Sequence, residues 1–150
     1  MSYYFNKILK AKDFDQAIEQ VTLELKKEGF GVLTQIDVKA TLKKKIDADF
    51  KKYMILGACN PHYAHKALQR EDKIGVFLPC NVIVEEHDNG DIEVSAVDPI
   101  ASMAKVENDT LGEIAVEIQN KLKIVISNLN WDRNLLKDKS QSAGWDLSFF

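Results

Sequence analysis

The chain has 150 residues, of which 45% are hydrophobic and 29% charged, and this composition is typical of one folded domain and excludes a largely disordered chain. Its formal net charge of -3 offers no positive field to a phosphate backbone, and no stretch has the length and apolar character of a membrane span or a secretion signal. We therefore expect a cytoplasmic protein that binds neither nucleic acid nor a membrane.

Hydrophobic periodicity in the first third of the chain predicts a strand, a helix and a second strand. Residues 3–9 alternate loosely between aromatic and polar and favour an edge strand. Asp13 then caps a helix that ends at Gly29, and its apolar residues share one face: Phe14, Ala17, Ile18, Val21 and Leu25. From residue 30 to residue 38 the period changes to two, which predicts a strand with at least one buried side.

The middle of the chain predicts two further helices and three strands. Residues 39–47 favour a short, mostly exposed helix, and an apolar strand follows at 53–58. Asn60 can cap a helix at 61–71, because its side chain can accept from first-turn amides and Pro61 tolerates the first helical position. Strands at 75–86 and 91–97 are joined by a hairpin turn that contains Asn-Gly.

A long helix and an aromatic tail complete the chain. Thr110 and Glu113 have the spacing of a capping box, and an apolar stripe follows: Leu111, Ile114, Ala115, Ile118, Leu122, Val125 and Leu129. Residues 130–150 lose this periodicity but keep four large aromatic residues: Trp131, Trp145, Phe149 and Phe150. We therefore expect a single domain at 1–129 and a separate tail at 130–150, which packs on the domain or on a dimer partner. The alternative is a tail that covers or fills a ligand groove.

Four segments carry a resemblance to a known family. They read GFGVLTQIDVK at 29–39, ILGACNP at 55–61, LPCNV at 78–82 and DP at 98–99. In this order they resemble the bacterial and archaeal family called domain of unknown function 302, over about residues 14–129. The family pattern commonly has Glu before the Ile-Asp pair, where this chain has Gln35, which cannot exchange a proton.

The resemblance implies a fold and an assembly, but no established activity. The implied fold is α+β, with two layers similar to the TATA-binding-protein-like group. A curved, mainly antiparallel sheet is gripped by helices, in the order strand, helix, four strands, helix, with short extra helices. The implied assembly is a homodimer.

The near-mirrored segments Cys59-Asn60-Pro61 and Pro79-Cys80-Asn81 hold both cysteines and mark the candidate site. We expect a site for a small, partly apolar ligand, in which Asn60 and Asn81 supply hydrogen bonds and the thiols perform no chemistry. Asp37 and Lys39 are expected at its rim. The alternative is a thiol-dependent enzyme or redox protein, in which a helix N-terminus activates Cys59 and Cys80 assists.

Other chemistries are less compatible with the sequence. Two thiolates and two imidazoles would suit zinc, at Cys59, His62, His65 and Cys80, but helical spacing turns the two histidines away from Cys59. Asp37 and Asp98 follow strands, where Asp is more often a cap or turn former than a catalytic group. No metal, cofactor or catalytic residue is therefore predicted. We expect a homodimeric ligand-binding or interaction module rather than an enzyme, and in the interaction alternative the tail binds the partner.

Overall fold

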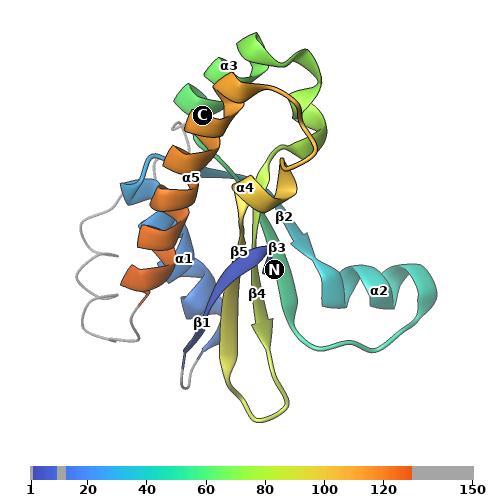
Figure 1. Ribbon diagram of the computed structural model, residues 1–150. Coiled ribbons are helices and arrows are strands. Elements are labelled where there is room, and N and C mark those ends of the chain that lie inside the picture. The colour runs from blue at the N-terminus through green and yellow to red at the C-terminus, as the bar shows by residue number, and fades with distance from the viewer. Residues whose placement is uncertain (1, 10–12, 130–150) are drawn as a thin grey trace.

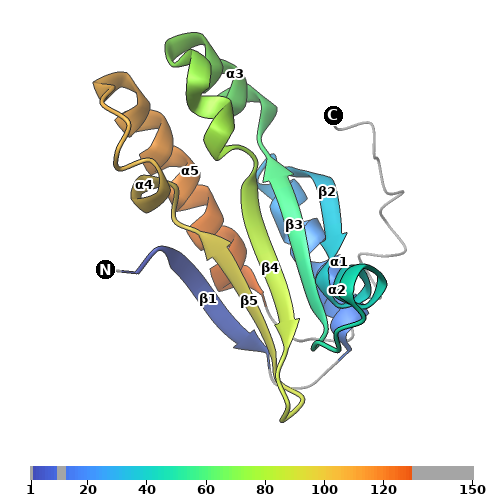
Figure 2. The same cartoon turned by 90° about the vertical axis from the view of Figure 1, so that its right-hand side faces the viewer.

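The computed structural model describes residues 2–9 and 13–129. Five strands form one antiparallel sheet in the order β1-β5-β4-β3-β2: β1 (Tyr4–Leu9), β2 (Gly31–Asp37), β3 (Tyr53–Cys59), β4 (Cys80–Glu86) and β5 (Ile92–Val97) (Figure 1). Helices α1 (Phe14–Lys27) and α5 (Asp109–Asn128) cover one face of this sheet (Figure 2). The expected two-layer α+β fold and its order of elements are confirmed.

Helix α1 forms as its sequence predicts. The carboxylate of Asp13 caps its first turn by accepting hydrogen bonds from the amides of Asp15 and Gln16, at 2.9 and 3.4 Å. The helix ends before Gly29, whose φ of +86° is a conformation that residues with a side chain rarely adopt. The apolar stripe of α1 faces the sheet, and Ala17, Val21 and Leu25 are fully buried.

Helix α5 provides the other half of the cover. Every residue of its predicted apolar stripe is buried, from Leu111 to Leu129. The predicted capping box is wrong, because Asn108 and not Thr110 is the N-cap, and its side-chain oxygen accepts from the amide of Thr110 at 3.2 Å. Asn is as good a capping residue as Thr, and here it lies two positions earlier.

The two faces of the sheet differ because side chains alternate along each strand. Under α1 and α5 lie buried apolar residues of the three central strands: Leu56, Ala58, Val82, Val84, Ile92, Val94 and Ala96. The opposite face, which we call the open face, carries Asn6, Ile36, Tyr53, Ile55, Ile83, Glu85, Glu93 and Ser95. Figure 2 shows this face toward the viewer, with α2 (Val38–Ile46) projecting at its β2 edge.

Two predicted strands differ from the structure. The buried side expected for residues 30–38 is wrong beyond Val32, because β2 is an edge strand and a register shift between Val32 and Thr34 breaks its alternation. The strand predicted from residue 75 begins only at Cys80. Residues 72–77 instead form a short 3-10 helix, η1 (Asp72–Phe77), whose Ile74 packs in a second small core with Ala67 and Leu111.

Two shorter helices complete the described part of the chain, α3 (Pro61–Arg70) and α4 (Pro99–Ser102). The predicted hairpin between β4 and β5 is confirmed, and the amide of His87 donates to the carbonyl of Asp91 at 2.8 Å. Among the described residues, the structure contains no helix with the length and apolarity needed to cross a bilayer. The predicted tail at 130–150 lies outside the described residues.

Candidate functional site

The structure brings three of the six predicted ligand-binding residues together. Cys80 is the register partner of Ala58 on the neighbouring strand, and Cys59 and Asn60 follow at once. These three line a small cavity of about 20 Å³, together with apolar side chains such as Phe30 and Leu111. Since one water molecule needs roughly 10–15 Å³ of cavity volume, the cavity has room for about one water molecule.

Asn60 does not act as the predicted side-chain cap of α3. Its backbone begins α3, but its side chain makes no capping hydrogen bond. Instead its Nδ2 donates to the carbonyl of Glu28 at 3.3 Å, which ties the start of α3 to the end of α1. The predicted cap is therefore wrong, because the side-chain amide is used for this tertiary contact. The Oδ1 atom is buried and has no hydrogen-bond partner among the described residues.

Neither thiol is set up as a nucleophile. Burial raises the pKa of Cys59, although this residue lies just before the N-terminus of a helix. Burial, with a smaller contribution from Cys59, raises the pKa of Cys80 to about 11. Both groups are therefore protonated thiols near neutral pH, and the thiol-enzyme alternative is not favoured.

The other predicted site residues lie elsewhere. Asp37 caps α2 by accepting from the amide of Ala40 at 2.9 Å, and Lys39 is exposed on the same helix. Asp98 caps α4 in the same way, by accepting from Ile100 at 3.0 Å. Asn81 lies on the opposite side of β4 from Cys80 and is exposed.

The open face of the sheet holds a larger groove, which contains Asn81. Its volume is about 460 Å³. Its lining combines three tyrosines, three apolar residues, two small polar residues and three ionisable residues: Tyr3, Tyr4, Tyr53, Ile83, Ala96, Val97, Asn81, Ser95, Glu85, His87 and Glu93. Apolar surface with convergent polar groups beside it is typical of small-molecule sites.

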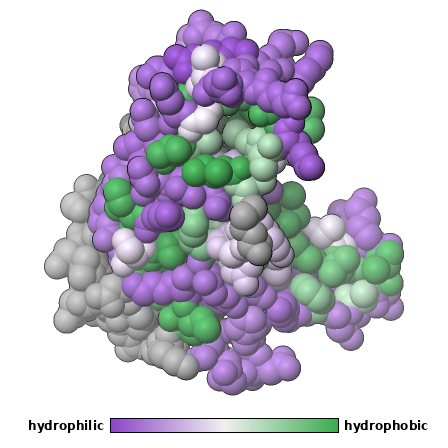
Figure 3. All heavy atoms as spheres, in the orientation of Figure 1, coloured by the Kyte–Doolittle hydropathy of each residue, from purple (hydrophilic) through white to green (hydrophobic). Residues whose placement is uncertain are grey.

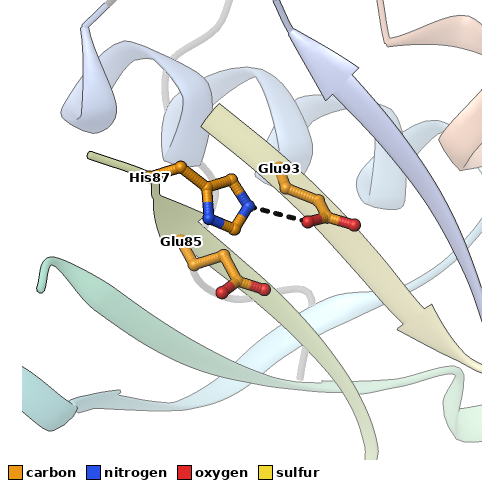
Figure 4. A group of neighbouring side chains, drawn as sticks. All are labelled: Glu85, His87 and Glu93. Atoms are coloured by element: carbon orange, nitrogen blue, oxygen red, sulfur yellow. Dashed lines mark hydrogen bonds and ion pairs between the residues drawn. The ribbon is translucent and has the colours of Figure 1, made fainter. Parts of the chain in front are cut away.

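Glu85, His87 and Glu93 form a cluster in this groove, with possible ligand atoms all within 4.8 Å of one another (Figure 4). His87 Nε2 lies 2.8 Å from Glu93 Oε1, while Glu85 Oε1 forms an ion pair with Lys51 Nζ at 2.6 Å. The side chain of Asn6 donates to Glu93 Oε2 at 2.7 Å. Hydrogen bonds from Asn6 and His87 lower the pKa of Glu93, and the bond to Glu85 raises the pKa of Lys51.

This cluster was not predicted from the sequence, although the sequence contains a signal for it. The hairpin turn at 87–90 fixes the register of β4 and β5, which places Glu85 opposite Glu93. His87 lies two residues after Glu85 and therefore projects to the same face. By contrast, the described residues hold no group of four formed by Cys59, His62, His65 and Cys80 that could share an ion.

Comparisons with known proteins agree with this fold. A solved structure of an uncharacterised conserved DUF302 protein from Bacillus stearothermophilus has a TM-score of 0.78 and 29% sequence identity, over 85% of this chain and 98% of that chain. No curated protein matches significantly. The family model described as "Domain of unknown function DUF302" matches residues 5–129, most of the chain. The chain therefore belongs to the DUF302 family, for which no specific activity is established.

Proposed function

We propose that this chain is a non-catalytic module that binds a small, partly apolar ligand in the groove of the open face. The groove volume of about 460 Å³ carries this proposal, because sites for small molecules have volumes of roughly 300–1,000 Å³. Tyr53, Ile83 and Val97 offer apolar surface, and Asn81 and Ser95 offer hydrogen bonds beside it.

The cavity at the cysteines is a weaker candidate for the same role. With about 20 Å³ it holds little more than a water molecule, whereas the groove is over twenty times larger. Of the six residues selected from the sequence, we therefore retain Asn81 as a ligand contact. Cys59, Asn60 and Cys80 are proposed to pack the interior behind the sheet, and a cytoplasmic location remains part of the prediction.

Binding of Nile red, an uncharged fluorescent dye, tests the proposal. A neutral probe is needed because two carboxylates lie in the groove. We expect saturable binding to the intact chain, and Ile83→Glu should weaken it about tenfold or more, since the apolar surface of one such side chain contributes about 1.5–3 kcal/mol. The matched control is Val76→Glu on η1, where the native side chain is 80% exposed and outside the groove. Equal dye affinity in both variants would contradict the proposal.

We further propose that the module acts as a homodimer. Ile36 and Ile55 are register partners on the open face and do not line the groove, and Ile36 is 46% exposed. Nearby, α2 projects from the molecule with apolar side chains on its surface, including Ile46 at 69% exposure (Figure 3). Contiguous exposed apolar surface of this kind is typical of interfaces between chains.

A second copy of the chain is the partner that the family resemblance implies, and the oligomeric state in solution tests it. Sedimentation velocity should show a dimer for the unmodified chain and a monomer for Ile36→Asp. Ile124→Asp on α5, where the native residue is 42% exposed, serves as the control and should remain dimeric.

A further inference from the structure

We propose that Glu85, His87 and Glu93 bind a divalent transition-metal ion, Zn²⁺ being the best match. This inference goes beyond the proposed ligand binding and does not depend on it, since it rests on the three side chains and not on the rest of the groove. It also departs from the sequence-based expectation that the chain has no metal site.

The geometry is close to that of a bound ion. Two ligand atoms at about 2.1 Å from a tetrahedral zinc ion lie roughly 3.4 Å apart. The ligand atoms of the three residues lie within 4.8 Å of one another, and His87 Nε2 and Glu93 Oε1 are 2.8 Å apart. Small side-chain rotations are therefore enough to place all three on one ion (Figure 4).

The backbone holds this cluster firmly. Glu85 and Glu93 are register partners on neighbouring strands, and His87 follows β4 directly. The hydrogen bond between the amide of His87 and the carbonyl of Asp91, at 2.8 Å, closes the hairpin beside them. Sites built on strands keep their geometry better than sites on long loops, so binding requires no rearrangement of the chain.

Charge also favours a cation at this position. Glu85 and Glu93 face one another across the strand pair, and like charges in that arrangement are destabilising. Their side chains are only 13% and 17% exposed, so water screens this repulsion incompletely. Lys51 supplies one positive charge against two carboxylates, which leaves a net charge of -1 when the imidazole is neutral. A divalent ion would neutralise this negative charge and bind both carboxylates.

The donor set indicates the class of ion. One imidazole with two carboxylates suits Zn²⁺ and similar transition ions better than Mg²⁺ or Ca²⁺, which prefer oxygen ligands alone. Asn6 binds Glu93 Oε2, so the ion would take the place of the hydrogen bond between Glu93 Oε1 and His87 Nε2. Three protein ligands would leave a fourth position directed into the groove, as in zinc sites that bind a further molecule.

Lys51 provides the most specific consequence of the proposal. Its ammonium group lies 2.6 Å from Glu85 Oε1 and therefore competes with the ion for this carboxylate. If the four groups form only a structural ion-pair network, removal of Lys51 creates no metal affinity. If they form a metal site, Lys51→Met should strengthen binding of the ion.

Calorimetric titration of the full-length chain with zinc chloride at constant pH tests the proposal. We expect one ion per chain, at least tenfold weaker binding for Glu93→Gln and His87→Gln, and tighter binding for Lys51→Met. Glu86→Gln is the matched control, because it removes the same charge next to the cluster from a residue outside it. The chain has three histidines, so a variant with both His62→Gln and His65→Gln should bind zinc as the unmodified chain does.

A second measurement avoids the risk that a variant fails to fold. In NMR spectra of the unmodified protein, zinc should shift the imidazole signals of His87 while those of His62 and His65 stay in place. Absence of zinc binding, binding that is unaffected by Glu93→Gln, or shifts at His62 and His65 alone would each overturn the proposal. Nile red affinity is measured without metal, so failure of the ligand-binding proposal is seen separately.

Discussion

The side-chain amide of Asn60 lies against Gly29, so closely that a Cβ atom at residue 29 would be 2.9 Å from Asn60 Nδ2. The same nitrogen donates to the carbonyl of Glu28. Asn60 therefore joins the start of α3 to the turn between α1 and β2, a contact between segments about thirty residues apart. This contact requires a residue without a side chain at position 29.

Gly29→Ala should therefore destabilise the fold by more than its backbone conformation alone explains. Gly29 and Gly90 have almost the same positive φ, +86° and +88°, but a Cβ at Gly90 would meet no described residue within 4 Å. Gly90→Ala should lower the free energy of unfolding by about 1–2 kcal/mol, the usual cost of this conformation. We expect Gly29→Ala to cost about 1 kcal/mol more, measured by urea unfolding.

A double-mutant cycle isolates the contact with Asn60. In an Asn60→Ala background the amide is absent, so the additional cost of Gly29→Ala should largely disappear. The cost of Gly90→Ala should be the same in both backgrounds, because that turn is far from Asn60 in the fold. An undiminished additional cost at Gly29 would show that the amide is not its cause.

Gly57→Ala should also destabilise the protein, in this case through packing. A Cβ at residue 57 of β3 would lie 2.2 Å from Thr34 Oγ1 and 2.8 Å from Pro79 Cγ. Such overpacking costs about 1–3 kcal/mol. A Cβ at Gly112 in α5 would contact no other part of the described chain within 4 Å, so Gly112→Ala should instead stabilise the chain by up to about 1 kcal/mol through helix propensity. The prediction would be contradicted if the two substitutions changed the free energy of unfolding in the same direction relative to the unmodified chain.

The fold could be predicted from the sequence because local pattern and tertiary packing agree over its two main helices. The stripe of α5 from Leu111 to Leu129 is buried as its spacing predicts. The hairpin between β4 and β5 follows from Asn89-Gly90, since that dipeptide suits a tight turn. Burial of β2 could not be predicted, because its position at the sheet edge is a tertiary property.

The candidate site was only partly predictable for a similar reason. Proximity of Cys59 and Cys80 depends on the register of β3 and β4, which places Ala58 opposite Cys80. Sequence spacing gives no such register when twenty residues that include a helix separate two strands. The division of Cys80 and Asn81 between opposite faces follows from strand alternation, once a strand is known to begin at Cys80.

Both thiols should react slowly in the native protein. Burial raises the pKa of Cys59 and of Cys80, and the Cys80 side chain is almost inaccessible. With iodoacetamide at pH 8, we expect alkylation to be at least about tenfold slower than in urea, with half-buried Cys59 reacting before Cys80. Mass spectrometry of peptides at timed intervals would measure both rates. Native Cys59 reacting faster than the unfolded thiol would restore the thiol-enzyme alternative.

Stability should fall at alkaline pH, and Cys80 should account for part of this decrease. Its pKa rises from 9.0 to about 11 on folding, so between these values the thiol ionises in the unfolded chain while it stays protonated in the folded one. The stabilising contribution is therefore complete below pH 9 and is lost as pH rises through 11. At pH 10 the loss relative to pH 7 is about 1 kcal/mol.

The comparison that measures this contribution is urea unfolding of the native chain and of Cys80→Ala at several pH values from 7 to 10. Cys80→Ala lowers stability at every pH through lost packing, but it removes the titrating thiol. The native chain should therefore lose more stability with rising pH than the variant does. Tyrosines and lysines that titrate in the same range are present in both proteins and cancel in the difference. Parallel pH profiles would mean that the Cys80 thiol ionises equally readily in the folded and unfolded chain, and that its burial does not disfavour the thiolate.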